Sequence, residues 1–282
     1  MKQKEFCLRL KLQKNIANKE IYYLIDQLDF VQEDITFDII NELDISSELH
    51  YKVVQAMKNS ALNSCIDRIL MQCEIITIFD KLYPAQLREI YHPPIILFAR
   101  GDLNLLRRKI TVIVGSRYPT EYSTFVLENL IPNLVKQDIV IASGLARGVD
   151  ALAHTKTLKN GGKTIAVIGN GLNYFYPKQN QDLQLNIMNQ GLILSEYLPD
   201  TPPLPFRFVE RNRILAGLCE NVIITEAKKK SGSLITANYA LEANRNIFAV
   251  PGPLSSPLSE GPNELIAAGA YPILKDDFEI PL

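Results

Sequence analysis

Six short apolar runs recur through residues 110–250, and segments of helical length separate most of them. The runs occupy residues 110–114, 139–142, 164–168, 192–194, 222–225 and 247–250, and two earlier runs lie at 74–79 and 95–99. Continuous apolar, β-branched runs are typical of strands that are buried on both faces of a sheet. Strand–helix alternation with right-handed crossovers produces a mainly parallel sheet. The sequence therefore predicts an α/β fold.

Residues 1–72 contain neither glycine nor proline, and their pattern is different. Apolar residues recur at three- and four-residue spacing within 17–28, 35–43 and 48–57, which is typical of short amphipathic helices. We therefore expect a small all-helical domain over residues 1–72, followed by the α/β domain over residues 73–282.

The composition is that of an ordinary globular protein, with 47% hydrophobic and 22% charged residues in a chain of 282. The sequence has no apolar stretch of membrane-spanning length and no apolar signal-peptide core at its start, so we expect a cytoplasmic protein that does not contact a membrane. Its four cysteines and three histidines are scattered, which predicts neither a metal site nor disulfides. Because the net charge is −1, any nucleic acid must bind to a local basic patch.

The six runs end in loops that are rich in glycine and serine: GSR, SGLARG, GNG, SEY, TEAKKKSG and PGP. Such residues let a ligand or another backbone come close to the chain. The carboxyl ends of parallel strands lie at one edge of a sheet, where ligands bind in open α/β folds. The sequence thus predicts a crevice lined by these loops. It contains no GxGxxG turn, Walker motif, HExxH motif or GxSxG elbow, so we expect neither a cofactor nor catalysis.

Two of these loops precede predicted helices and could bind an anion. Ser143-Gly144 and Ser231-Gly232-Ser233 would present backbone N–H groups at a helix start, which suits phosphate. The alternative is that Ser143 and Ser233 only cap their helices. Candidate cations are Arg117, the arginines of segment 206–213, Lys163 and the lysine run 228–230, although a lysine run is commonly just a solvated face.

Phe206 and Phe208 alternate with Arg207, so both rings would face the same way if this segment were extended. Aromatic rings interleaved with arginines are what single-stranded nucleic acid uses, because bases stack on the rings while cations follow the phosphates. The alternative is that both rings belong to the core.

An ordered set of motifs from about residue 75 to the end resembles the DNA-processing protein A (DprA/Smf) family. The motifs are VGSR, SGLARGVDALAH, GGKTIAVIGNGL, YPKQN, LSEY, RNRILAGL, EAKKKSGSLITA, FAVPG and EGPNELIAAGA. The resemblance implies an extended Rossmann-like domain, preceded by a small helical, SAM-like domain. It also implies a non-catalytic protein that binds single-stranded DNA, protects incoming strands during natural transformation and loads the RecA recombinase. The resemblance further implies a homodimer formed through the C-terminal part of the Rossmann-like domain.

Together, the residues and the resemblance predict the following DNA-binding set: Gly115, Ser116, Arg117, Ser143, Gly144, Lys163, Asn170, Phe206, Phe208, Arg211, Asn212, Arg213, Lys228, Ser231, Gly232 and Ser233. The resemblance places the dimer and RecA contacts at Glu264, Leu265, Ile266 and Pro272. Segment 265–274 could equally be a buried final helix and strand, and both interpretations can hold together.

Two other functions compete with DNA binding. A phosphoribohydrolase of the lysine-decarboxylase-like type also has glycine-rich strand ends, but it is marked by a PGGxGTxxE motif; the nearest segment here is PGPLSSPLSEG at 251–261. The other alternative is an interaction scaffold with a vestigial crevice. The cations at Arg117, Arg211 and Lys228 count against it.

Overall fold

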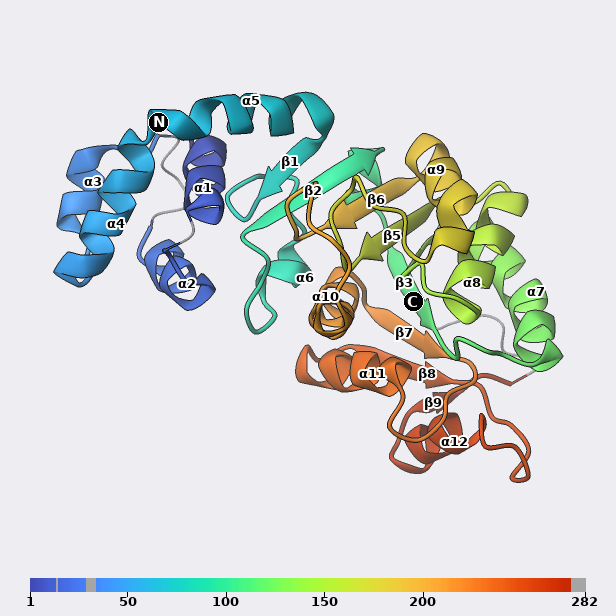
Figure 1. The fold of residues 1–282 in the computed structure, drawn as a ribbon. Coiled ribbons are helices and arrows are strands. Elements are labelled where there is room, and N and C mark those ends of the chain that lie inside the picture. Colours follow the sequence, from blue (N-terminus) through green and yellow to red (C-terminus); the bar gives the residue numbers. More distant parts are fainter. Residues whose placement is uncertain (14, 29–33, 275–282) are drawn as a thin grey trace.

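The computed structural model describes residues 1–13, 15–28 and 34–274, which form a nine-stranded sheet and the helices around it (Figure 1). The last eight residues of the predicted α/β domain lie outside the described residues. The strands are β1 (Glu74–Thr77), β2 (Ile96–Gly101), β3 (Ile110–Val114), β4 (Val140–Ser143), β5 (Thr164–Ile168), β6 (Leu192–Ser195), β7 (Asn221–Ile224), β8 (Asn246–Ala249) and β9 (Tyr271–Pro272).

The strand order in the sheet is β1-β2-β6-β5-β4-β3-β7-β8-β9. Strands β3 to β9 run parallel to their neighbours within this group, whereas β2 pairs antiparallel with both β1 and β6. All eight apolar runs of the sequence form strands, with ends that differ by at most two residues. The predicted α/β fold with a mainly parallel sheet is therefore confirmed.

Helices cover both faces of the sheet because the winding direction reverses. From β3 the chain moves outward through β4, β5 and β6, and it then returns past β3 to β7 and β8. Right-handed crossovers consequently place α7–α9 on one face and α10 and α11 on the other (Figure 1). The helices of this part are α6 (Ala85–Arg88), α7 (Glu121–Lys136), α8 (Val149–Lys159), α9 (Gln181–Gln190), α10 (Pro205–Leu218), α11 (Gly232–Glu242) and α12 (Glu260–Ala267). Short 3-10 turns lie at Ser60–Leu62, Leu103–Arg107 and Lys178–Asn180.

Alternating side chains of the central strands supply both cores. On β3, Ile113 belongs to the buried cluster that contains Leu127 and Leu130 of α7. Its neighbour Val112 belongs to the opposite cluster, which contains Leu215 of α10. Burial of one such aliphatic side chain contributes about 1.5–3 kcal/mol to folding. Burial on both faces explains why these strands are apolar throughout rather than alternating with polar residues.

The N-terminal part is helical, as the spacing of its apolar residues predicts. It contains α1 (Gln3–Leu12), α2 (Asn18–Asp26), α3 (Phe37–Glu42), α4 (Ser47–Lys58) and α5 (Asn63–Gln72). Thr36 and Ser46 cap α3 and α4 by accepting hydrogen bonds from the Ile39 and Leu49 backbone N–H groups at 3.3 and 3.2 Å. Buried side chains of these helices are continuous with those of the sheet, so the boundary at residues 72 and 73 stays a prediction.

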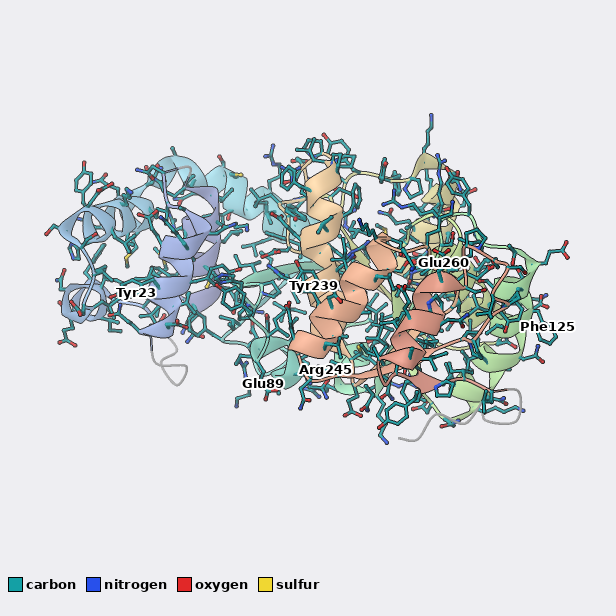
Figure 2. All side chains as sticks on the ribbon, turned by 90° about the horizontal axis from the view of Figure 1, so that it is seen from below. Tyr23, Glu89, Phe125, Tyr239, Arg245 and Glu260 are labelled. Carbon is teal, nitrogen blue, oxygen red and sulfur yellow. The ribbon has the colours of Figure 1, made fainter. Side chains whose placement is uncertain are left out.

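Seen from below, the N-terminal helices lie at one end of the molecule and α7 at the other, with α10, α11 and α12 between them (Figure 2). None of the helices in the described ranges has the length and apolar character needed to cross a lipid bilayer. Strand β3 lies between β4, which follows it in the chain, and β7, which the chain reaches by returning from β6. Loops diverge at such a switch point, which opens a crevice at the carboxyl ends of the strands.

Candidate functional site

A crevice of about 630 Å³ opens at this switch point, between the loops after β3 and β7 and the first turns of α10 and α11. It brings together many of the predicted DNA-binding residues: Gly115, Ser116, Arg117, Phe208, Arg211, Asn212, Lys228, Ser231, Gly232 and Ser233.

The loop after β3 is held tightly against the loop after β7. The Ser116 backbone N–H donates to the Glu226 carbonyl at 2.6 Å, and a Cβ atom at Gly115 would lie 2.6 Å from the Thr225 hydroxyl oxygen. Glycine is therefore required here for close backbone approach. Arg117 follows in an exposed position, and no other described residue forms a hydrogen bond or ion pair with its guanidinium. This cation is free to meet a ligand.

The buried carboxylate of Glu226 anchors the chain that follows Arg117. It accepts hydrogen bonds from the Thr120 backbone N–H at 2.8 Å, the Thr120 hydroxyl at 2.7 Å and the Ser123 hydroxyl at 2.7 Å. These bonds join the β7 loop to the first turn of α7. Sequence reasoning missed this residue, although a lone carboxylate two residues after a buried strand is a usable signal for such a clamp.

The start of α11 forms the opposite wall. Ser233 does not cap the helix with its side chain: its hydroxyl donates to the Gly115 carbonyl at 2.8 Å and so attaches α11 to the β3 loop. Asn212 holds the same turn by donating to the Gly232 carbonyl at 3.2 Å. The Ser231 hydroxyl is buried without a partner among the described residues. Because the first N–H groups of a helix lack intrahelical acceptors, this turn can bind an anion, and exposed Lys228 stands beside it.

The predicted anion site at Ser143-Gly144 already holds an anion from the protein itself. The buried Asp150 carboxylate accepts hydrogen bonds from the Gly144 and Ala146 backbone N–H groups at 3.1 and 3.3 Å. The Ser143 hydroxyl is buried and donates to the Ile113 carbonyl at 2.6 Å, so it neither caps a helix nor faces the crevice. Burial raises the pKa of Asp150, and the nearby Arg211 charge opposes this shift.

Arg211 lies at the base of the crevice, where its guanidinium forms hydrogen bonds within the protein and is therefore not a free cation. Its buried guanidinium donates to the Gly144 carbonyl at 2.7 Å, to the Val167 carbonyl and to the Asn212 side-chain oxygen at 3.1 Å. Desolvation lowers its pKa to about 10, so it remains protonated at neutral pH. A Cβ atom at Gly144 would lie 2.4 Å from this guanidinium, which explains the glycine there.

The segment with Phe206 and Phe208 is helical, so the condition under which both rings would face the same way is not met. Pro205 occupies the first turn of α10, where its fixed φ favours helix initiation. Phe208 lines the crevice and stacks on Tyr176, with ring centroids 5.0 Å apart. Phe206 is 53% exposed and lies outside the lining.

Three other predicted residues also lie elsewhere. Lys163 precedes β5, so it lies at the amino ends of the parallel strands, whereas the crevice lies at their carboxyl ends. Its ammonium group donates to the Gln190 carbonyl at 3.1 Å. Asn170 is fully buried and donates to the Gly171 and Tyr174 carbonyls. Arg213 forms an ion pair with Glu196 at 2.7 Å in a different pocket.

Tyr118 is a lining residue that sequence reasoning missed. Its ring is 75% exposed, and it directly follows Arg117. An aromatic residue beside the strand-end arginine was the available signal. Among the described residues that line the crevice, Tyr118 and Phe208 supply the aromatic rings.

The residues predicted for dimer and RecA contacts lie at the far edge of the sheet. Glu264, Leu265 and Ile266 belong to α12, and Pro272 belongs to the edge strand β9. Glu264 is exposed and forms an ion pair with Lys229 at 2.5 Å. Ile273, which follows β9, is buried in the core. The final helix and strand therefore combine buried and exposed apolar residues.

The doubly wound sheet and the cationic crevice at its switch point define a Rossmann-like α/β protein without dinucleotide-binding glycines. Within the described ranges, no three His, Cys, Asp or Glu side chains are grouped to hold a metal ion. Residues 74–280 match the family model described as DNA recombination-mediator protein A. The chain belongs to this family.

Relatives and solved structures agree with this assignment. The chain is 41% identical to DNA processing protein DprA of Streptococcus pneumoniae over 261 residues, 92% of each chain. It is 46% identical to DprA of Bacillus subtilis over 208 residues, which are 72% of this chain and 70% of that one. Its fold matches the X-ray structure of the S. pneumoniae protein with a TM-score of 0.87, 37% identity and full coverage of both chains. A structure of DNA processing protein A from Helicobacter pylori, described for its single-stranded DNA binding mode, gives a TM-score of 0.66 at 35% identity, covering 72% of this chain and 92% of that one.

Proposed function

We propose that the protein is a cytoplasmic, non-catalytic recombination mediator that holds single-stranded DNA in the crevice, protects the strand and loads RecA onto it. The observation that carries the proposal is the pair of free, exposed cations, Arg117 and Lys228, which flank the start of α11 beside two aromatic rings. The H. pylori relative, whose structure is described for single-stranded DNA binding, supports the same ligand.

The crevice offers one kind of contact for each part of a DNA strand. Phosphates would lie on Arg117, Lys228 and the N–H groups at the start of α11, since this end of the helix dipole is positive. Bases would stack on Phe208 and Tyr118, at about 1–3 kcal/mol per base and with little dependence on sequence. A double helix keeps its bases stacked inside, so it would lose the second contribution.

The carboxylates beside the crevice support binding without catalysis. Asp150 lines the crevice, but its Oδ2 atom is already bound by two backbone N–H groups. Glu226 is bound by three donors of the first turn of α7. Both groups stabilise the loops, and neither is placed as a free general base for hydrolysis.

We place the dimer and RecA contacts at Glu264, Leu265, Ile266 and Pro272. Support comes from β9, the last strand of the sheet within the described residues, since the Tyr271 side chain on it and the nearby Leu274 side chain are exposed. An apolar sheet edge is suited to pairing with another chain. Sedimentation of Ile266→Glu against the wild type tests this part: a monomeric variant supports it, and an unchanged dimer, or a monomeric wild type, contradicts it.

Fluorescence anisotropy of a labelled oligo-dT strand, measured over a salt series with a duplex control, tests the DNA proposal. Arg117 and Lys228 would each contact one phosphate. When the logarithm of the affinity is plotted against the logarithm of the salt concentration, these two contacts predict a slope of about −1.4. Arg117→Ala should reduce its magnitude by about 0.7 and weaken binding at low salt.

Lys163→Ala is the matched control because Lys163 lies at the opposite edge of the sheet. It should leave affinity and slope unchanged. Equal losses in the Arg117 and Lys163 variants, or equal affinity for single strand and duplex, would contradict the crevice as the binding site.

A further inference from the structure

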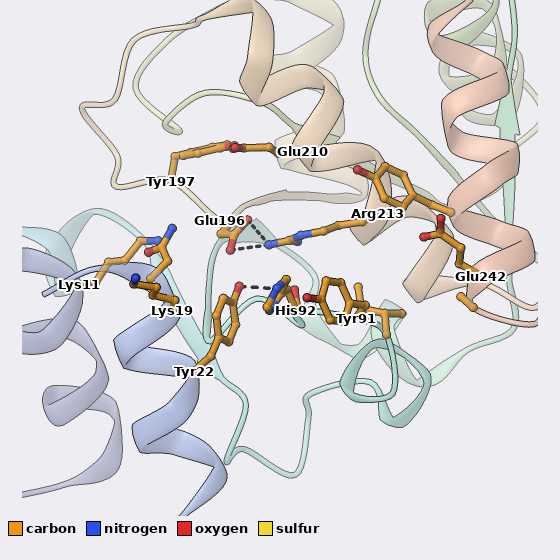
Figure 3. Close-up of a pocket in the computed structure, with 14 residues that line it drawn as sticks. Lys11, Lys19, Tyr22, Tyr91, His92, Glu196, Tyr197, Glu210, Arg213 and Glu242 are labelled. Atoms are coloured by element: carbon orange, nitrogen blue, oxygen red, sulfur yellow. Dashed lines mark hydrogen bonds and ion pairs between the residues drawn. The ribbon is translucent and has the colours of Figure 1, made fainter. Parts of the chain in front are cut away.

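A second pocket, of about 400 Å³, lies between the N-terminal helices and the Rossmann-like part (Figure 3). It lies on the opposite side of α10 from the crevice: Phe208, Arg211 and Asn212 line the crevice, whereas Glu210 and Arg213 line this pocket. Residues two apart on a helix point about 200° apart, which accounts for this division. The DNA proposal does not use this pocket.

The pocket has opposite charges on its two sides. Lys11 of α1 and Lys19 of α2 lie on the N-terminal side, and Glu242 of α11 lies across the pocket from them (Figure 3). None of these three side chains has a hydrogen bond or ion pair with another described residue. Charged groups that converge unpaired on a concave surface are available to a ligand.

Aromatic rings lie along the wall between the two charged ends. Tyr22, His92 and Tyr91 form a row in which neighbouring ring centroids are 4.7 and 3.9 Å apart (Figure 3). Tyr91 ends the row and is 81% exposed, so one face of its ring remains open. Such a ring can stack on a planar ligand.

A buried ion pair forms the wall facing these rings. Nη2 of Arg213 donates to both carboxylate oxygens of Glu196 at 2.7 Å. Nη1 of the same guanidinium is buried and has no acceptor within the described part of the chain. Buried donors are nearly always paired, so this group can donate to a ligand in the pocket.

We propose that this pocket binds a purine nucleotide. The phosphate would lie against Lys11 and Lys19, and the base would stack on Tyr91. The N–H donors of the base or the hydroxyl groups of the sugar would face Glu242 and Glu210. The separation of the charges favours this class, because a nucleotide has its phosphate and its base at opposite ends. A free amino acid has both charges beside one carbon atom and cannot reach both walls.

Calorimetric titration of the full-length protein with AMP, GMP and CMP tests the proposal. AMP or GMP should bind more tightly than CMP. Tyr91→Ala should weaken purine nucleotide binding roughly tenfold, the loss expected for one stacked base. Lys19→Ala should weaken AMP binding and leave adenosine unchanged. Tyr51→Ala is the matched control, because this exposed tyrosine of α4 lies outside the pocket.

A free nucleotide and a purine of a bound DNA strand offer the same chemistry, and oligo-dA and oligo-dT strands distinguish the two sources. If the strand is the source, Tyr91→Ala weakens oligo-dA binding more than oligo-dT binding. If the nucleotide is free, both strands are unaffected and AMP or GMP binds. The inference is overturned if neither the binding of AMP or GMP nor the binding of oligo-dA is weakened by Tyr91→Ala or Lys19→Ala. Arg117→Ala should leave AMP binding unchanged, which separates this result from the DNA proposal.

Discussion

The carboxylate of Asp150 should be one of the most important single groups for the stability of the crevice. It accepts the Gly144 and Ala146 backbone N–H groups at 3.1 and 3.3 Å, and its charge attracts the buried Arg211 guanidinium. Asp150→Ala removes the acceptor while changing little apolar volume. The loop that resembles a phosphate-binding turn would then be empty.

The expected loss follows from these contacts. A buried N–H group without a partner costs about 1–3 kcal/mol, a half-buried one costs less, and Arg211 also loses its nearby opposite charge. We therefore expect Asp150→Ala to lower the free energy of unfolding by about 2–4 kcal/mol, mostly from these two N–H groups. Asp150→Asn keeps one acceptor oxygen and should lose about half as much.

Urea unfolding at neutral pH, followed by circular dichroism, measures this difference. Asp67→Ala is the matched control, since this aspartate is exposed within α5, beyond its first turn, and should change stability by less than about 0.5 kcal/mol. Added phosphate should restore part of the stability of Asp150→Ala and leave the wild type unchanged. If Asp150→Ala is as stable as the control, the account of this loop is wrong.

Three further predictions concern other single groups. Burial lowers the pKa of His154 from 6.5 to about 3, so the neutral imidazole stabilises the folded state fully above pH 6.5. As the pH falls to about 5, the unfolded state binds the proton and the free energy of unfolding should drop by about 2 kcal/mol. Urea unfolding of His154→Gln should lack this part of the pH dependence. Gly148 has a φ of 74°, and a Cβ atom there would lie 2.3 Å from the Ser116 carbonyl oxygen, whereas Gly161 has a φ of 72° and open space. Thermal unfolding should therefore show Gly148→Ala losing at least about 2 kcal/mol and Gly161→Ala about 1 kcal/mol; equal losses would contradict the clash. Glu226→Ala should weaken oligo-dT binding roughly fivefold in anisotropy titrations, about 1 kcal/mol, with an unchanged salt slope, because it positions Arg117 without touching phosphate; a changed slope would count against this role.

Local pattern was sufficient to predict the sheet and the location of the crevice. Buried parallel strands are apolar throughout, and their carboxyl ends share one edge, so Gly115, Arg117 and Gly232 could be placed together from the sequence. Lys163 could have been excluded by the same rule, because it precedes its strand and must lie at the other edge.

The remaining differences between the predicted and the observed site depend on the path of the backbone, which the spacing of residues in the sequence does not contain. Arg211 and Arg213 are two residues apart, but the helical backbone of α10 directs one beneath the crevice and the other into the second pocket. The helix likewise separates Phe206 from Phe208. Short motifs do not show that Asp150 occupies the N–H groups of the Ser143-Gly144 turn, because that depends on how the loop folds back on α8.

Photo-cross-linking of a strand that carries 5-iododeoxyuridine tests most directly whether the crevice is the DNA groove. Mass spectrometry of the cross-linked peptides would identify the residues in contact with the bases. The account predicts cross-links at Tyr118 and Phe208, which are lost in excess unlabelled oligo-dT. Cross-links confined to the opposite edge of the sheet, around Lys163, would contradict it.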